Sequence, residues 1–347
     1  MLERHLYEHF GIHLKNVEQA GNDLIIFDEQ ETYILRPYPQ TQIVHLEERL
    51  KMAEHFQSLN HLGIAYPMKA KGGSTLNIID GQETVLFQLK TGLNREQQIQ
   101  EKSKAKKLAQ FHLDGESYVS TSKQENATWT SWRERWIKRL EQLESWYVKI
   151  MNEPVKTALD TEFILTFPYY LAMTENAIQM VTEMISMKPS YYSDGNGRTV
   201  CHHRFHENSW LKTDNLNISD VKFPTDFVCD HFTRDITEYL RHIAKNEQVL
   251  QEKIDRANRF IKRYHSVKNF VEWDGYIIVS RLLFPAQYFD VLEKYYQAID
   301  DKTRSEMETK FVNMVTKSED YEMFIQHICS LFFTAKDPSI LPEWLIN

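Results

Sequence analysis

Cysteine is scarce in this sequence. The 347 residues contain three cysteines, Cys201, Cys229 and Cys329, which are odd in number and widely separated. Proteins that are held together by disulfides carry an even set of cysteines at close spacing. The count therefore excludes a disulfide framework and favours a reducing compartment.

Long apolar runs and an excess of basic residues are also missing. No run of about 18 apolar residues could span a bilayer, and residues 1–6 lack the basic-then-apolar pattern of a secretory signal. We therefore expect a protein that is made in the cytosol, stays soluble and has no membrane partner. The formal net charge of −8 argues against a nucleic-acid partner. The one dense basic run, Lys102, Lys104, Lys106 and Lys107, lies on a predicted helix and is interpreted as its solvated face.

Glycine is sparse where a phosphate-binding loop would need it. The chain has 11 glycines, and Gly21 is the only one near the first predicted strands, residues 23–27 and 32–37. Backbone N–H groups approach a phosphate closely when several glycines open the loop. A phosphate-binding loop at this point would therefore hold its ligand loosely.

The N-terminal part of the chain has the pattern of a small β-rich lobe. Polar residues 28–31 separate two β-rich runs, and Asp80-Gly81 separates two more, as in a hairpin. The predicted strands are residues 23–27, 32–37, 76–79 and 84–89, and the predicted helices are residues 1–15 and 42–61.

Beyond Lys90 the apolar spacing becomes helical. The predicted helices are residues 95–113, 130–150, 168–187, 233–247, 248–266, 277–299, 303–317 and 319–334. Because 347 residues with 42% hydrophobic content exceed the usual size of one core, we expect two lobes. Residues 1–90 would form the β-rich lobe, and residues 91–347 the helical one.

Residues 200–211 contain three histidines within five positions, His202, His203 and His206. Such a run is typical of metal ligands or of a catalytic loop, and a structural role in hydrogen bonding is the simpler alternative. For the structural role we expect Arg204 to pair with a carboxylate such as Asp235. A metal site would need further ligands from Cys201, Cys229, Asp230 or His231. Their spacing matches no known metal motif.

Four motifs occur in an order that resembles the protein-kinase-like fold, in its aminoglycoside and choline phosphotransferase branch. They are the strand Tyr33-Ile34-Leu35-Arg36, the helix that carries Glu47 and Glu48, Leu108-Ala109-Gln110-Phe111-His112, and Arg234-Asp235-Ile236-Thr237-Glu238. The resemblance implies an α+β, bilobal fold. Its small N-terminal antiparallel β lobe would contain one main helix, and its large C-terminal lobe would be mostly helical.

Within that fold the chain resembles the spore coat-associated kinase-like proteins of the YutH type. Active relatives carry His-Gly-Asp-x-His-x-x-Asn in the catalytic loop, and five positions here correspond to its five defined residues: His202, His203, Arg204, His206 and Ser209. The two histidines are kept, but Arg204 replaces the catalytic Asp, and an arginine cannot accept a proton. The resemblance therefore implies no catalytic residues and no metal site.

The resemblance also places a degenerate nucleotide site. Arg36 stands where the phosphate-pairing Lys would be, and Glu48 stands for that lysine's partner. Asn208 would hold metal if the loop were shifted by one residue. Asp226 is favoured as the metal-binding Asp, with Asp220 and Asp230 as the alternatives.

These features leave three functional hypotheses. The first is an inactive kinase-like protein, a pseudokinase without cofactor, which acts as a structural or interaction component of the endospore coat with other coat proteins as partners. The second is an active small-molecule phosphotransferase that uses ATP and Mg²⁺, with Glu207 as a displaced base. The third is a metal-binding module at the histidines.

Overall fold

The computed structural model describes residues 2–29, 31–38, 45–61, 63–89, 103–120, 131–193, 195–211, 220–334 and 341–345. The chain forms two compact units. Unit 1 contains residues 1–126 and 198–235, and unit 2 contains residues 127–197 and 236–347. The predicted lobe boundary at Lys90 lies outside the described residues.

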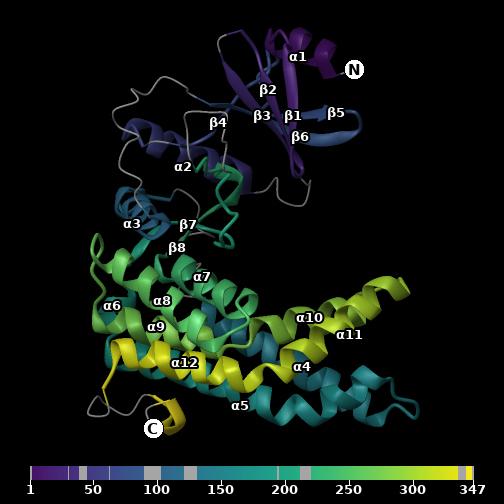
Figure 1. The fold of residues 1–347 in the computed structure, drawn as a ribbon, viewed down its shortest axis with the longest axis vertical. Coiled ribbons are helices and arrows are strands. Elements are labelled where there is room, and N and C mark those ends of the chain that lie inside the picture. The colour runs from purple at the N-terminus through teal and green to yellow at the C-terminus, as the bar shows by residue number, and fades with distance from the viewer. Residues whose placement is uncertain are drawn as a thin grey trace. The chain divides into compact units, whose positions relative to one another are not determined.

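Unit 1 is built on an antiparallel sheet of six strands (Figure 1). The strands are β1 Asn16–Ala20, β2 Asp23–Phe27, β3 Thr32–Pro37, β4 Tyr66–Pro67, β5 Leu76–Ile79 and β6 Gln82–Leu89. Their order is β1-β2-β3-β6-β4, and β5 also pairs with β6. The four predicted strands and both predicted turns are confirmed, whereas β1 and β4 were not predicted. β1 is half exposed, so its sequence shows little of the apolar pattern from which a buried strand is predicted.

Alternation along the strands buries both faces of this sheet. Ile25, Ile34 and Phe87 lie in one apolar cluster, which also contains Leu46 of helix α2, Leu46–Ser58. Their chain neighbours, among them Ile26, point to the opposite cluster, which includes Leu6 of helix α1, Leu2–Phe10. A helix therefore accompanies each face, which explains why these strands read as continuous apolar runs.

A second structural layer of unit 1 contains the start of the histidine-rich stretch, residues 200–211. Helix α3, Lys104–Gly115, packs on a two-stranded antiparallel sheet of β7, Arg198–His202, and β8, Phe227–His231. The short helix η4, Pro224–Asp226, leads into β8. Neither strand was predicted, because each is a five-residue buried segment without polar alternation.

The packing of α3 on β7 needs Gly115. A Cβ at this position would lie 2.5 Å from Thr199 Oγ1 and 2.9 Å from the Val200 nitrogen. The Thr199 hydroxyl donates a hydrogen bond of 2.6 Å to the His112 carbonyl. The end of α3 and the start of β7 are therefore joined without space for a side chain.

Unit 2 is helical. Its helices are α4 Trp132–Asn152, α5 Ala158–Met187, α6 Pro189–Ser193, α8 Leu250–His265, α9 Glu272–Leu283, α10 Ala286–Gln297, α11 Asp301–Thr316 and α12 Ser318–Phe332, together with all but the first turn of α7, Thr233–Asn246. No helix among the described residues is long and apolar enough to cross a bilayer.

The prediction of one helix over residues 277–299 is wrong. The chain forms α9 and α10 instead, and Pro285 is the N-cap of α10. Proline lacks the N–H that a continuous helix would need, yet the apolar spacing runs through it without interruption. The α+β fold class is confirmed. The remaining predicted helices form, but α1 ends at Phe10 and not at residue 15, and α5 begins at Ala158 and not at residue 168. Parts of the 42–61 and 95–113 predictions lie outside the described residues.

Candidate functional site

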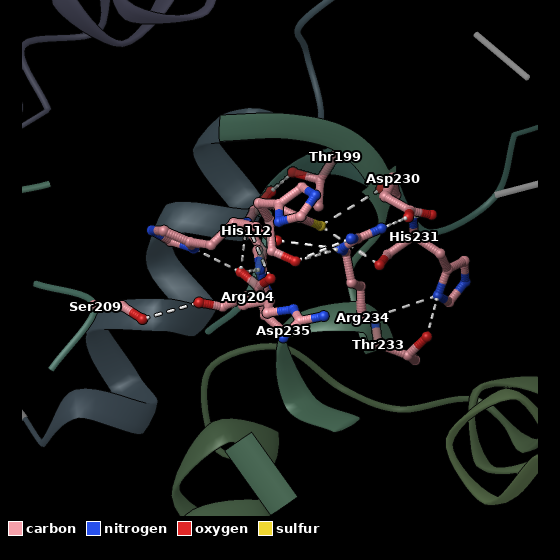
Figure 2. A network of polar contacts seen from close by, with 12 residues as sticks. His112, Thr199, Arg204, Ser209, Asp230, His231, Thr233, Arg234 and Asp235 are labelled. Atoms are coloured by element: carbon pink, nitrogen blue, oxygen red, sulfur yellow. Dashed lines mark hydrogen bonds and ion pairs between the residues drawn. The ribbon is translucent and has the colours of Figure 1, made fainter. Parts of the chain in front are cut away.

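Asp235 is the centre of a buried polar network in unit 1 (Figure 2). The residue is 0% exposed. Its carboxylate accepts hydrogen bonds from the His202 backbone nitrogen at 2.9 Å, His202 Nδ1 at 2.7 Å and His112 Nε2 at 3.1 Å. α7 supplies the carboxylate, β7 supplies His202, and α3 supplies His112, so one side chain joins three elements.

The partners of His202 define its tautomer. Nδ1 donates to Asp235, and Nε2 accepts a 2.9 Å hydrogen bond from Trp210 Nε1. Indole is a donor only, so Nε2 carries no proton. Burial alone would raise the pKa of Asp235, but His202 and His112 outweigh it and lower that pKa to about 2. The carboxylate is therefore charged, and His202 serves as a structural bridge to Trp210.

Arg234 fixes the chain that follows His202. Its guanidinium donates to the His203 carbonyl at 2.9 Å and to Asp230 Oδ2 at 2.6 Å. The pair is shielded from water, since the side chain of Asp230 is 0% exposed. Arg234 thus links residue 203, at the start of the loop that follows β7, to Asp230 of β8.

Hydrogen bonds within residues 203–209 close a turn. Ser209 Oγ accepts from the His206 nitrogen at 2.8 Å and donates to the Arg204 carbonyl at 3.1 Å. Burial is the main cause that lowers the pKa values of His203 and His206, so both are neutral at pH 7. Ser209, placed by the resemblance at the metal-binding Asn, closes this turn.

The expected pairing of Arg204 with Asp235 is wrong. The partners of Asp235 are the two histidines, and the side chain of Arg204 is exposed. A fully buried carboxylate that already accepts hydrogen bonds from two imidazoles and a backbone N–H has little acceptor capacity left. Arg204 is therefore not the partner of the Asp235 carboxylate.

An internal pair of arginine and carboxylates does form in unit 1, but around Arg36 of β3. Its Nε and NH2 donate to the two oxygens of Asp23 at 2.9 and 2.8 Å, and its NH1 donates to Asp226 Oδ2 at 3.0 Å. The guanidinium also lies 3.4 Å from the ring centroid of Phe223. All three nitrogens and one face of Arg36 are therefore occupied by the chain itself.

The turn between β1 and β2 is short. Ala20 pairs with Asp23, which leaves a two-residue connection, Gly21-Asn22. Gly21 has a φ of +65°, a value that favours glycine. Two residues provide few backbone N–H groups for an anion, so the shortage of glycine in this region corresponds to a tight hairpin.

The three candidate metal-binding aspartates differ in access. The side chain of Asp226 is 46% exposed, against 11% for Asp220 and 0% for Asp230. Asp220 is bonded to Lys107, and Asp230 is bonded to Arg234. Asp226 also adjoins the histidine loop, because its carbonyl accepts from the His203 nitrogen at 2.7 Å. Asp226 is therefore the accessible carboxylate of the three.

The other predicted positions are dispersed. Glu48 is buried and accepts a 2.5 Å hydrogen bond from the Tyr118 hydroxyl, whereas Arg36 is bonded to other carboxylates. Asn208 is exposed, and its nitrogen donates to His206 Nδ1. Glu207, the alternative base, forms an ion pair with Lys104 at 3.3 Å.

The predicted metal set of His202, His203 and His206 does not form among the described residues. Three other potential ligands, His112, Cys201 and Asp235, lie together instead. They are already engaged: His112 binds Asp235, and the Cys201 thiol donates to the His231 carbonyl at 3.4 Å. Burial raises the pKa of Cys201, so it stays a thiol, whereas zinc needs a thiolate. This cluster fits a hydrogen-bond network better than a metal site.

Asp23 was missed in the sequence, although a signal for it was present. β2 and β3 pair Leu24 with Leu35, and one step along that register brings Asp23 opposite Arg36. Opposite charges on paired positions stabilise a hairpin, so a register drawn from the turn at residues 28–31 would have found the pair.

Comparisons with known proteins agree on the family and the fold. The sequence profile of the family described as spore coat putative kinase YutH matches residues 3–328. The endospore coat-associated protein YutH of Bacillus subtilis strain 168 is 28% identical over 305 residues, which are 87% of this chain and 85% of that protein.

Solved structures show the same fold at low sequence identity. An aminoglycoside phosphotransferase from Alicyclobacillus acidocaldarius has a TM-score of 0.64 at 12% identity, and 92% of each chain is covered. A spectinomycin phosphotransferase in complex with ADP and spectinomycin has a TM-score of 0.60 at 14% identity, with 94% of this chain and 98% of that chain covered. The expected kinase-like fold is therefore confirmed, and the chain belongs to the YutH family of spore coat putative kinases.

Proposed function

We propose that this protein is a catalytically inactive, kinase-like component of the bacterial endospore coat, where it acts by binding other coat proteins. Coat association comes from the B. subtilis relative, which is named as endospore coat-associated. Inactivity is supported by one main observation: each of the three guanidinium nitrogens of Arg36 donates a hydrogen bond to Asp23 or Asp226. The groups that would contact phosphate and metal are bound to each other.

Arg204 supports the same conclusion. Phosphoryl transfer needs a residue that accepts or orients the acceptor proton, and the guanidinium cannot do so. The two-residue turn Gly21-Asn22 adds a third argument, because it provides few N–H groups for a phosphate. We expect neither ATP nor Mg²⁺ as a resident cofactor.

Nucleotide binding gives the direct test. A ligand at a hundred times its dissociation constant stabilises the folded state by about 2.7 kcal/mol. We expect no shift of the thermal unfolding midpoint with ATP and Mg²⁺ at millimolar concentration. A saturable shift that Asp226→Asn removes would support the alternative, an active small-molecule phosphotransferase with Glu207 as base, and would contradict the proposal.

Restoring the missing carboxylate separates the two obstacles. Arg204→Asp returns the residue type of active relatives but leaves Arg36 engaged, so we expect no phosphate transfer from ATP to a panel of small hydroxyl acceptors. The parent chain is the matched control. If Arg204→Asp alone produced turnover, Arg36 would not be the obstacle.

Coat function is tested in a spore-forming host that lacks the gene. Extracted coat fractions should contain the protein, and its absence should change the set of extracted coat proteins. An Asp226→Asn variant should restore the parental pattern, because the proposed role needs no metal-binding carboxylate. A stable Asp226→Asn protein that failed to restore it would favour the active phosphotransferase.

A further inference from the structure

Unit 2 contains a cavity of about 360 Å³ that the site in unit 1 does not use. Its wall is formed by parts of α5, α7, α8 and α10 and by the junction of α11 with α12. The volume lies in the range of small-molecule sites. Five of the described lining residues are cationic and none is Asp or Glu; the cations are Arg241, Lys245, Lys253, Lys310 and Lys317.

Two of these cations are neutralised within unit 2. Arg241 binds Glu238 at 2.6 Å, and Lys253 binds Asp320 at 3.2 Å. These pairs contribute little net charge to the cavity. Arg241 also donates to the Phe284 carbonyl, which fixes its position in the wall.

The other three cations are not neutralised. Lys317 donates to a neutral partner, the amide oxygen of Gln248, at 3.0 Å. Lys245 and Lys310 are exposed and form no ion pair or hydrogen bond with any residue that the structure describes. In a chain with a net charge of −8, three uncompensated ammonium groups at one cavity create a local positive field.

The start of α10 adds to this field. Pro285, the N-cap, and Ala286 and Gln287 of the first turn all line the cavity. The turn contains no acidic residue, and no side chain caps it. The Ala286 nitrogen donates to the Phe284 carbonyl at 2.8 Å and the Tyr288 nitrogen donates to the Pro285 carbonyl at 2.9 Å, so these two N–H groups are already used. The turn still adds the positive end of the helix dipole, which favours an anion as the lysines do.

Much of the remaining wall is aromatic or apolar, and its neutral polar members are Gln287, Asn313 and Ser318. Tyr170 and Tyr288 stack at 3.8 Å between ring centroids, and Tyr169, Met173 and Phe284 lie in the same wall. Burial raises the pKa of Tyr170, so its hydroxyl stays protonated at neutral pH and does not oppose an anion. Such a wall suits a ring that is attached to the charged group.

We propose that this cavity binds a small aromatic dianion, with its charged group at Lys245, Lys310, Lys317 and the start of α10 and its ring against the tyrosines. Phosphate monoesters and dicarboxylates share this chemistry. The inference is independent of the proposed coat function, since it uses residues of unit 2 alone.

Isothermal titration of the full chain tests the proposal with phenyl phosphate and phthalate as probes. We expect saturable binding of at least one of them, and the preferred probe identifies the phosphate or the carboxylate source. Phenol and inorganic phosphate are the neutral and the ring-free controls, and both should bind at least tenfold more weakly. Equal binding by either control, or no saturable binding of both dianions up to about 10 mM, would overturn the proposal.

Variants connect the binding to the cavity. Lys245→Gln together with Lys310→Gln should weaken the preferred probe at least tenfold. The matched control is Lys294→Gln with Lys302→Gln, two exposed lysines outside the cavity lining, which should leave the affinity unchanged. Thermal unfolding midpoints should stay equal in all variants, because the four side chains are exposed. Equal affinity in both double variants would refute the assignment.

Discussion

The substitution Asp235→Asn tests how the histidine segment is held. The carboxylate accepts from three N–H groups in a fully buried position. An amide keeps one acceptor oxygen but turns the other position into a donor, which then faces an N–H group. Losing one hydrogen bond to a buried charged group costs about 1.5–3 kcal/mol.

The pKa of Asp235 gives a magnitude of the same size. His202 and His112 more than offset the effect of burial and lower that pKa from 3.8 to about 2, which corresponds to about 2 kcal/mol in the free energy of unfolding. Because the folded pKa is depressed, this stabilisation is present above pH 3.8 and is lost as the pH falls towards 2. At pH 7 we therefore expect Asp235→Asn to lower the free energy of unfolding by about 2–3 kcal/mol.

Urea unfolding followed by circular dichroism at pH 7 measures this loss. Asp226→Asn is the matched control, because that side chain is 46% exposed and a surface pair contributes less than about 1 kcal/mol. The midpoint should fall for Asp235→Asn with an unchanged denaturant slope. The reasoning would be refuted if the free energy of unfolding fell equally in the two variants, or if it fell by less than about 0.5 kcal/mol in Asp235→Asn. The hydrogen bonds of Asp235 would then not stabilise the fold as argued.

Three further substitutions test other contacts. Trp210→Phe removes the donor to His202 Nε2 and leaves a buried acceptor unsatisfied, so the free energy of unfolding should fall by about 1–3 kcal/mol in urea titrations; no loss would contradict the assigned tautomer. Gly115→Ala should destabilise by about 1–3 kcal/mol through the clash with Thr199, whereas Gly72→Ala, with open space around it, should not; equal effects would exclude the clash. Burial lowers the pKa of Lys222 to about 8, so the unfolded chain binds more protons than the folded chain between pH 8 and 10.5. The free energy of unfolding should therefore rise with pH in this range by up to about 3 kcal/mol. Lys222→Met should flatten that rise, and a variant with the parental slope would refute the argument.

Local patterns were sufficient for most elements of this fold. The β2–β3 and β5–β6 hairpins follow from turn residues between apolar runs, and most helices follow from apolar spacing. Prediction failed where a short segment is buried without alternation, as in β7 and β8. It also failed where apolar spacing continued through a break, as at Pro285.

The candidate site was only partly predictable. The arginine at position 204 and the scarcity of glycine can be read directly from the sequence, and the resemblance to the kinase-like family implies that Arg204 stands at the position of the catalytic Asp. One partner was assigned wrongly, because Asp235 accepts from His112 and His202 and not from Arg204. The ion pairs of Arg36 with Asp23 and Asp226 were not predicted. Hydrogen bonds between residues far apart in the chain cannot be predicted from local patterns, because they depend on which buried groups the packing of separate elements brings together.

The sequence by itself determined most strands and helices, because periodicity is a local property, and the order of its motifs indicated the fold class and the family. It also showed an arginine, which accepts no proton, at position 204. Only the tertiary structure decided that Asp235 accepts hydrogen bonds from two histidines and that Arg36 joins Asp23 to Asp226. It also brought to one cavity three lysines that pair with no carboxylate among the described residues. Asp226 is 190 positions from Arg36, and no pattern along the chain encodes a contact that forms only when separate elements pack.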